Sequence, residues 1–197
     1  MKLYILRHCK RENSSLFFSP LIDEGLKNAE NLKNKLPENI DLIFSSPFLR
    51  TLQTIYPYCK KHNKKVNIEN ALYEYCQKPD FNINSKKFSE CEYKKLEKHH
   101  HLLNLFNKDY TSSHFLSNIT FLENENDLQN RICPFIYKIC HKYKNTNKNI
   151  LMVTHMSVCN YIKKCFNKNI KINSNFEMGE FEIIEINNNW KGIIQIT

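Results

Sequence analysis

Short apolar runs alternate along the chain with longer segments whose apolar residues recur at helical spacing. The runs are too short for a helix and rich in β-branched and aromatic residues, which predicts buried strands at residues 3–6, 42–44, 66–68 and 149–154. Helical spacing predicts helices at 23–36, 46–56, 127–143 and 157–166. The alternation predicts an α/β fold, a three-layer sandwich in which helices flank a mostly parallel central sheet.

Several residues are expected to mark the ends of these helices. Asp23 is a predicted N-cap, and Pro37 ends the helix that follows it. Ser46 is predicted to cap the second helix, with Pro47 at the first helical position. Pro57 is then expected to kink or interrupt that helix, because a proline ring removes an internal hydrogen bond.

The length of 197 residues suits a single domain, 1–197, with room for an inserted segment. The pattern blurs from about residue 76 to 122, and we interpret this stretch as a cap insertion that includes one or two helices between 86 and 106. Long connections of this kind often serve as lids or binding loops. Near the end, two alternating segments at 181–186 and 190–196 predict a hairpin or adjacent edge strands.

The chain is basic, with a formal net charge of +9, which favours anionic partners. The lysines are dispersed among asparagines instead of gathered in a run, so the charge does not choose between phosphorylated substrates, nucleic acid and acidic membrane. Glycine occurs only three times. The clustered glycines of a P-loop or a dinucleotide-binding loop are therefore excluded.

The eight cysteines form no C-x-x-C pair and have no zinc-type spacing with histidine. Arg7 interrupts the apolar run near the start, so we expect no signal peptide, and no stretch reaches membrane-spanning length. These features predict a cytoplasmic, reduced protein without a membrane partner.

The candidate chemistry lies at the ends of predicted strands. The first strand ends at Arg7-His8, with Arg11 three residues further on, and the strand at 149–154 ends at His155. Arg50 falls in the first turn of the second helix. Ligands of α/β folds bind at the carboxyl ends of strands, and an imidazole among guanidinium groups suits a dianion. The alternative is that the arginines are surface charges and His8 a loop residue.

Four pieces in chain order resemble the histidine phosphatase superfamily, which has the phosphoglycerate mutase-like fold: Arg7-His8 with Arg11, Ser45-Ser46-Pro47 with Arg50 and Gln53-Thr54, Leu72-Tyr73-Glu74, and Val153-Thr154-His155. Ser19-Pro20-Leu21, followed by Gly25, matches a further landmark of the family. Within the superfamily, Arg11 and the Tyr-Glu-Tyr context resemble the branch written R-H-G-E-R, which includes the Sts-type phosphatases.

The resemblance implies a phosphatase that hydrolyses a phosphomonoester through a phosphohistidine on His8, without a metal or cofactor. It implies that Arg7, Arg11, Arg50 and His155 bind the phosphoryl oxygens, because phosphoryl transfer depends mainly on positioning and positive charge. It assigns Glu74 as the proton donor to the leaving oxygen. The alternative for Glu74 is an exposed carboxylate at a strand end.

Two other phosphatase chemistries lack their residues. The cysteine phosphatase loop requires an arginine six positions after its cysteine, but Ser15 stands there after Cys9, and none of the other cysteines has the arginine. No two aspartates are two positions apart, which excludes a D-x-D nucleophile. Histidine is the remaining nucleophile.

Cys9 and Met156 depart from the family pattern. The family usually has glycine where this chain has Cys9, and often has glycine where it has Met156. Among so many cations the Cys9 thiol could be acidic and oxidisable. Two alternatives to a phosphatase therefore stay open, a phosphoglycerate mutase-type phosphotransferase and a catalytically weakened phosphate-binding module.

The expected partner is a phosphorylated small molecule or a phosphoprotein, and a homodimer is one expected state because dimers occur in the branch it resembles. A nucleic-acid partner is disfavoured because the sequence has no helix-turn-helix, RNA-recognition or finger pattern.

Overall fold

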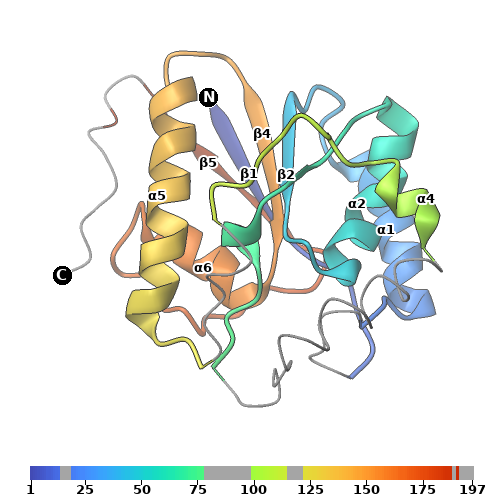
Figure 1. The fold of residues 1–197 in the computed structure, drawn as a ribbon, viewed down its shortest axis with the longest axis horizontal. Coiled ribbons are helices and arrows are strands. Elements are labelled where there is room, and N and C mark those ends of the chain that lie inside the picture. The colour runs from blue at the N-terminus through green and yellow to red at the C-terminus, as the bar shows by residue number, and fades with distance from the viewer. Residues whose placement is uncertain (14–18, 78–98, 115–121, 188–189, 191–197) are drawn as a thin grey trace.

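The fold is a three-layer sandwich, in which one sheet separates two groups of helices (Figure 1). The computed structural model describes residues 1–13, 19–77, 99–114, 122–187 and 190. These contain β1 (Lys2–Arg7), α1 (Asp23–Lys35), β2 (Leu42–Ser45), α2 (Leu49–His62), β3 (Asn67–Ile68), the 3₁₀ turn η1 (Asn70–Leu72), α4 (His100–Leu103), α5 (Glu125–Tyr143), β4 (Asn149–Thr154), α6 (Met156–Lys164) and β5 (Phe181–Glu185).

The sheet has five strands in the order β3-β2-β4-β1-β5. β4 lies between β1 and β2 and pairs in parallel with both, and β3 extends the parallel part beyond β2. β5 pairs antiparallel with β1 at the other edge. The mostly parallel sheet flanked by helices is confirmed. Of the predicted final hairpin, 181–185 forms β5, and 191–196 lies outside the described residues.

Each face of the sheet carries its own hydrophobic core, because the parallel strands are buried on both sides. α1 and α2 pack over one core together with Leu6, Ile43 and Val153. α5 and α6 cover the other face, where α5 places Leu128, Ile132, Phe135, Ile136 and Ile139 in the core, as its helical spacing predicts. A capping box of Asn124 and Asp127 begins α5 two residues earlier than the hydrophobic pattern indicates.

The predicted helix starts are wrong in detail. Asp23 is the first helical residue of α1, and the N-cap is Ile22, which has no side chain able to accept a hydrogen bond. α2 begins at Leu49 instead of Pro47, with Phe48 as its N-cap, and the Ser46 hydroxyl contacts both the Phe48 N–H, at 3.4 Å, and His155. Pro57 lies inside α2, which continues to His62 because its flanking residues are anchored in the core.

The segment assigned to the cap insertion lies partly in the core. Leu102 and Leu105 are buried with residues of α2, and a β-bridge joins Phe106 to Val66. Residues 99–106 therefore belong to the main body, whereas 78–98 and 115–121 lie outside the described residues, and the cap boundaries stay a prediction. Within the described parts of the chain, no helix is long and apolar enough to cross a membrane.

Gly25 allows the loop after β1 to lie directly on α1. A Cβ atom at this position would be 1.9 Å from the Lys10 carbonyl oxygen, well inside the van der Waals limit. The backbone N–H of Ile22 donates to the same oxygen, at 3.2 Å. This close approach fixes the path of the chain between His8 and Arg11.

Gly25→Ala is expected to lower the free energy of unfolding by about 1–3 kcal/mol, because the methyl group forces backbone apart. Helix propensity alone predicts the opposite sign, a gain of roughly 1 kcal/mol. Urea unfolding measures the difference, with the exposed Asn31→Ala in the same helix as the matched control. A variant as stable as the wild type would contradict the close approach.

Candidate active site at the carboxyl ends of the parallel strands

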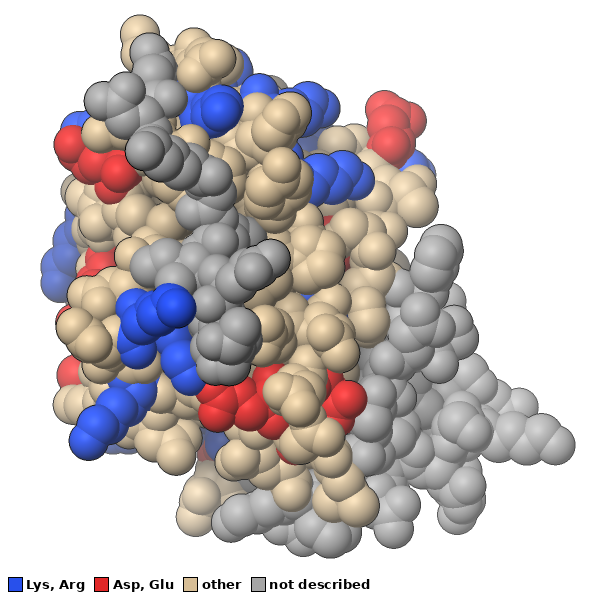
Figure 2. Space-filling model, turned by 90° about the vertical axis from the view of Figure 1, so that its left-hand side faces the viewer, with Lys and Arg blue, Asp and Glu red and all other residues tan. Residues whose placement is uncertain are grey.

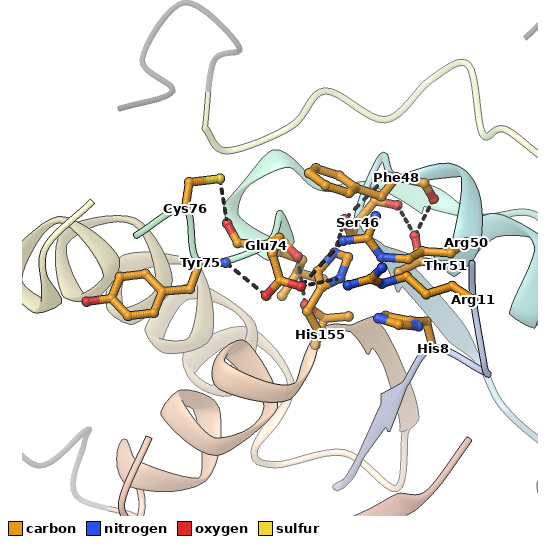
Figure 3. A network of polar contacts seen from close by, with 12 residues as sticks. His8, Arg11, Ser46, Phe48, Arg50, Thr51, Glu74, Tyr75, Cys76 and His155 are labelled. Atoms are coloured by element: carbon orange, nitrogen blue, oxygen red, sulfur yellow. Dashed lines mark hydrogen bonds and ion pairs between the residues drawn. The ribbon is translucent and has the colours of Figure 1, made fainter. Parts of the chain in front are cut away.

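The site forms where three parallel strands end. Arg7 of β1 lies opposite Thr154 of β4, and Ser45 of β2 lies opposite Val153, so the residues that follow each strand meet at one edge. His8, Ser46 and His155 are these next residues. Figure 3 shows them together with Glu74, which comes from the turn after η1. The sequence predicts that each histidine follows a strand, and the register shows that these two strands are neighbours.

His8 is buried, with 2% of its surface exposed, and its ring orientation is fixed by the backbone. Nδ1 lies 2.8 Å from the Cys9 carbonyl oxygen, which can only accept a hydrogen bond. Nδ1 therefore carries the proton in neutral His8, and Nε2 has the free lone pair. Burial, His155 and Arg50 lower the pKa of His8 well below its ordinary value, so the ring is neutral near pH 7.

His155 is fully buried and lies against His8, with ring centroids 5.2 Å apart. Its Nε2 is 2.9 Å from the Ser46 hydroxyl, and its Nδ1 is 3.3 Å from Oε2 of Glu74. Burial lowers the pKa of His155 to about 4, although Glu74 acts in the opposite direction. His155 is therefore also neutral at physiological pH.

Glu74 points into the site and meets both a guanidinium and an imidazole. Oε2 accepts a hydrogen bond from Nη2 of Arg50 at 3.4 Å and lies beside His155, while Oε1 accepts from the backbone N–H of Tyr75 at 3.1 Å. Burial alone would raise the pKa of Glu74, but His155, Arg50 and His8 outweigh it and lower the pKa below the usual carboxylate value. The side chain keeps 19% of its surface exposed, so it borders the solvent side of the site.

Three arginines surround these groups. Arg50 is fully buried in the first turn of α2, with its guanidinium carbon 4.5 Å from the centre of the Phe48 ring. Burial lowers its pKa to about 10, which leaves it charged at neutral pH. Arg7 donates from Nη1 to the Phe176 carbonyl. Arg11 donates to the Glu12 carbonyl at 2.7 Å, and Figure 3 shows its side chain beside Arg50, above His8.

The charges of these residues suit an anion. Arg11 interacts electrostatically with Arg7 and with Arg50. Of the three arginines Arg50 is paired with Glu74, which leaves an excess of positive charge suited to a phosphate dianion. α2 and α6 begin directly beyond β2 and β4, and their N-terminal backbone groups add positive potential at the same edge. The arrangement can bind a phosphoryl group and present a neutral imidazole nitrogen to it.

The same residues contain a possible metal-ligand set. One ligand atom each from His8, Glu74 and His155 lie within 4.8 Å of one another. Arg50 is already paired with Glu74 in this space, however, and its permanent charge opposes a divalent cation. The donor set therefore fits an anion better than a metal ion.

Sequence reasoning missed several supporting contacts. Thr54 accepts a hydrogen bond from the backbone N–H of Cys9 at 2.9 Å, and Gln53 accepts one from Leu21 at 2.8 Å, so α2 holds the loop that carries His8. Both residues follow Arg50 in the sequence motif, which is the signal that could have indicated this role. The prediction of an acidic Cys9 thiol is contradicted, because Cys9 is fully buried and burial raises the pKa of its thiol to about 11.

The described cysteines are all free. The Sγ atoms of Cys133 and Cys165 lie 3.7 Å apart, between α5 and the end of α6. Met156 begins α6 and packs against the core cluster on the α5 face.

Solved structures with the same fold include several phosphatases. The alpha-ribazole phosphatase from Shigella flexneri superposes with a TM-score of 0.67 at 19% identity, covering 98% of this chain and 94% of that one. A mycobacterial glucosyl-3-phosphoglycerate phosphatase gives 0.63 at 12% identity, over 92% and 88% of the two chains. The phosphoserine phosphatase from Entamoeba histolytica, in complex with 3-phosphoglyceric acid, gives 0.61 at 16% identity, over 92% and 89%.

No curated protein matches the sequence. The model of one protein family does match it, over residues 3–189, which is nearly the whole length. With the two histidines and their arginines at the strand ends, this match identifies the chain as a member of the histidine phosphatase superfamily, branch 1.

Proposed function

We propose that the protein is a metal-independent phosphatase that hydrolyses a phosphomonoester through a phosphohistidine intermediate on His8. The observation that carries the proposal is the state of His8, a buried neutral imidazole with Nδ1 held by the Cys9 carbonyl and arginines close by. Membership of the superfamily and the phosphatases among the structural relatives support the reaction class.

The first step is attack by Nε2 of His8 on phosphorus. A bond forms between Nε2 and phosphorus as the ester P–O bond breaks, so the phosphoryl group passes to the imidazole. The hydrogen bond from Nδ1 to the Cys9 carbonyl stabilises the positive charge that develops on the ring. Arg7, Arg11 and Arg50 provide the donors for the three equatorial oxygens.

Glu74 is the proposed proton donor to the leaving oxygen. In the ligand-free site it is ionised, because Arg50 and His155 stabilise the carboxylate. A phosphate dianion brings negative charge beside Glu74 and draws the same cations to itself, which raises the affinity of the carboxylate for a proton. His155, released from Glu74, then donates from Nδ1 to a phosphoryl oxygen.

The second step is hydrolysis of the phosphohistidine. Glu74, now ionised, removes a proton from water as the water oxygen attacks phosphorus, and the P–N bond breaks to return neutral His8. Inorganic phosphate leaves, and Glu74 retains the proton for exchange with solvent. Its partial exposure gives water access to this carboxylate.

The position of Cys9 supports turnover over a weakened binding module. Its side chain is buried in the core against α1 and α2, and its backbone carbonyl is the group that meets Nδ1 of His8. The thiol therefore does not occupy the space in front of His8. The mutase alternative stays a prediction, and intramolecular transfer in place of phosphate release is the result that would favour it.

The proposed substrate is a phosphorylated small molecule, with a phosphoprotein as the alternative. The relatives named above act on small phosphorylated compounds, which supports this order. On the face of the molecule that carries α5, basic and acidic side chains are interspersed and form no continuous basic surface (Figure 2). Assignment to the R-H-G-E-R branch, a homodimer and a cytoplasmic location stay predictions.

His8→Ala is expected to reduce the release of phosphate from p-nitrophenyl phosphate about 10⁴-fold or more, because no other described group replaces the nucleophile. Activity of the wild type is expected to persist in EDTA. The exposed His141→Ala serves as a control that removes an imidazole remote from the site. Full activity of His8→Ala, or loss of wild-type activity in EDTA, would contradict the mechanism.

The value of kcat/KM for an alkyl phosphate is expected to fall about tenfold per pH unit above the second phosphate pKa of about 6. The reaction needs one proton, carried either by Glu74 or by the phosphate ester. Glu74 is ionised in the free protein, so the proton comes with the ester and is lost when the ester becomes a dianion. Below pH 6 the rate is expected to hold, because the pKa of His8 is well below its ordinary value and the nucleophile stays neutral. The dependence of kcat/KM on pH is measured by steady-state kinetics between pH 4.5 and 8.5, a range of ~4 pH units. A rate that rises through pH 6.5 would show instead that His8 titrates in its ordinary range.

A further inference from the structure

A buried cluster lies on the far side of the turn that carries Glu74. It consists of Tyr73, Glu123 and Arg131, which have 1%, 4% and 4% of their surfaces exposed. Nε and Nη2 of Arg131 form a two-pronged contact with the Glu123 carboxylate, at 2.6 and 3.0 Å. The guanidinium carbon also lies 3.6 Å from the centre of the Tyr73 ring. We call these three residues the buried clamp.

The remaining hydrogen bonds of the clamp go to the turn at residues 71–76. Arg131 donates from Nη1 to the Ala71 carbonyl at 2.5 Å and from Nη2 to the backbone carbonyl of Glu74 at 3.2 Å. Glu123 accepts from the Tyr73 hydroxyl at 2.5 Å and from the Cys76 N–H at 3.1 Å. The Arg131–Glu123 ion pair thus makes four hydrogen bonds to groups of the turn at residues 71–76.

Stability alone does not account for such a cluster. Removing two charges from water costs several kcal/mol per ion, and packed apolar residues of the same volume often stabilise a core as well or better. What the ion pair adds is direction, because a guanidinium fork and a carboxylate fix the positions of the groups that they bind. Here those groups belong to the backbone on both sides of Glu74.

The clamp determines which way Glu74 points. Tyr73 has an extended backbone, with φ −63° and ψ 165°, and its ring lies under Arg131 while the next side chain, Glu74, reaches Arg50 and His155. With Tyr73 fixed under Arg131, Glu74 faces the active site, and Figure 3 shows Tyr75 directed away from it. A second tie joins the turn to the site, since the Thr154 hydroxyl donates to the Leu72 carbonyl at 2.7 Å, one residue before His155.

We infer that Tyr73, Glu123 and Arg131 are positioning residues, which hold the Glu74 carboxylate where it can transfer a proton to the leaving oxygen. This inference rests on the proposed function, because it assumes that Glu74 is the proton donor. None of the three residues contacts His8, His155 or Arg50 through a hydrogen bond or ion pair in the described structure. Their hydrogen bonds therefore act on the reaction through the turn that carries Glu74.

Leaving-group dependence separates this role from a structural one. An alkoxide requires a proton from Glu74, whereas p-nitrophenolate leaves without one, so a displaced acid slows alkyl esters selectively. A misplacement of 1 Å can cost about 10²-fold. Tyr73→Phe is expected to lower kcat/KM for β-glycerophosphate at least ~10-fold and kcat/KM for p-nitrophenyl phosphate less than ~3-fold. The comparison uses kcat/KM because this constant covers only the steps up to loss of the leaving group, whereas hydrolysis of the phosphohistidine by Glu74 is common to both esters. Arg131→Lys is also expected to lower the ratio of kcat/KM for β-glycerophosphate to kcat/KM for p-nitrophenyl phosphate.

Tyr58→Phe is the matched control. Tyr58 is also fully buried, and its hydroxyl also donates to an oxygen, the Pro37 carbonyl at 2.6 Å, but it lies in the core on the α1 and α2 face. Its substitution is expected to reduce stability by a similar amount and to leave the ratio of the two esters unchanged. Glu74→Gln is the positive reference, with the largest selective loss on the alkyl ester.

Amide hydrogen exchange tests the clamp without turnover. The Cys76 N–H donates to Glu123 and the Tyr75 N–H to Glu74, so both amides are expected to exchange about tenfold faster in Tyr73→Phe than in wild type or Tyr58→Phe.

Equal losses in kcat/KM on both esters, or unchanged exchange at residues 75 and 76, would overturn the positioning role. Failure of the proposed function gives a different result, in which the wild type hydrolyses neither ester while the exchange difference persists. That result would also withdraw the role assigned here, because the clamp would then position Glu74 for no proton transfer.

Discussion

The parallel pairing of β4 with both β1 and β2 is the constraint on which the site depends. Because parallel strands end at the same edge, this pairing places His8 and His155 next to each other, although they lie far apart in the sequence. A slip of one residue in either register would turn the apolar strand residues from one core to the other. Those residues fill the two cores, so the same hydrophobic contacts that stabilise the sheet also fix the distance between the two imidazoles.

Burial then gives these residues their chemical state. Desolvation keeps both imidazoles neutral, whereas Glu74 remains ionised because Arg50 and His155 contact it directly. The site thereby holds its positive charge on arginines that cannot lose their protons under physiological conditions. In the proposed mechanism a phosphoryl group meets fixed cations and a neutral nucleophile, and its arrival alters the balance at Glu74. Binding of the anion and preparation of the acid would then be two effects of the same charge.

The differences from the sequence predictions have a common origin in competition for hydrogen-bond partners and space. Ser46 was expected to cap α2, but its hydroxyl lies 2.9 Å from Nε2 of His155, and the helix begins at Leu49. Cys9 was expected to be reactive, but the turn of the chain directs its thiol into the core. Residues 99–106 were assigned to a cap, but Leu102 and Leu105 fill the core beside α2. In each case a tertiary contact replaced the local preference.

The sequence by itself determined the order of strands and helices, the parallel character of the sheet and the identity of the candidate site residues. It could do so because apolar periodicity reflects local geometry, and because His8, Arg50, Glu74 and His155 each follow a recognisable local signal. Only the tertiary structure decided the tautomer of His8, the ionisation of Glu74 and the contacts of Arg131 and Glu123, which no motif marked. These properties depend on distances between atoms of residues remote in the chain and on their removal from water, and neither is encoded in spacing along the sequence.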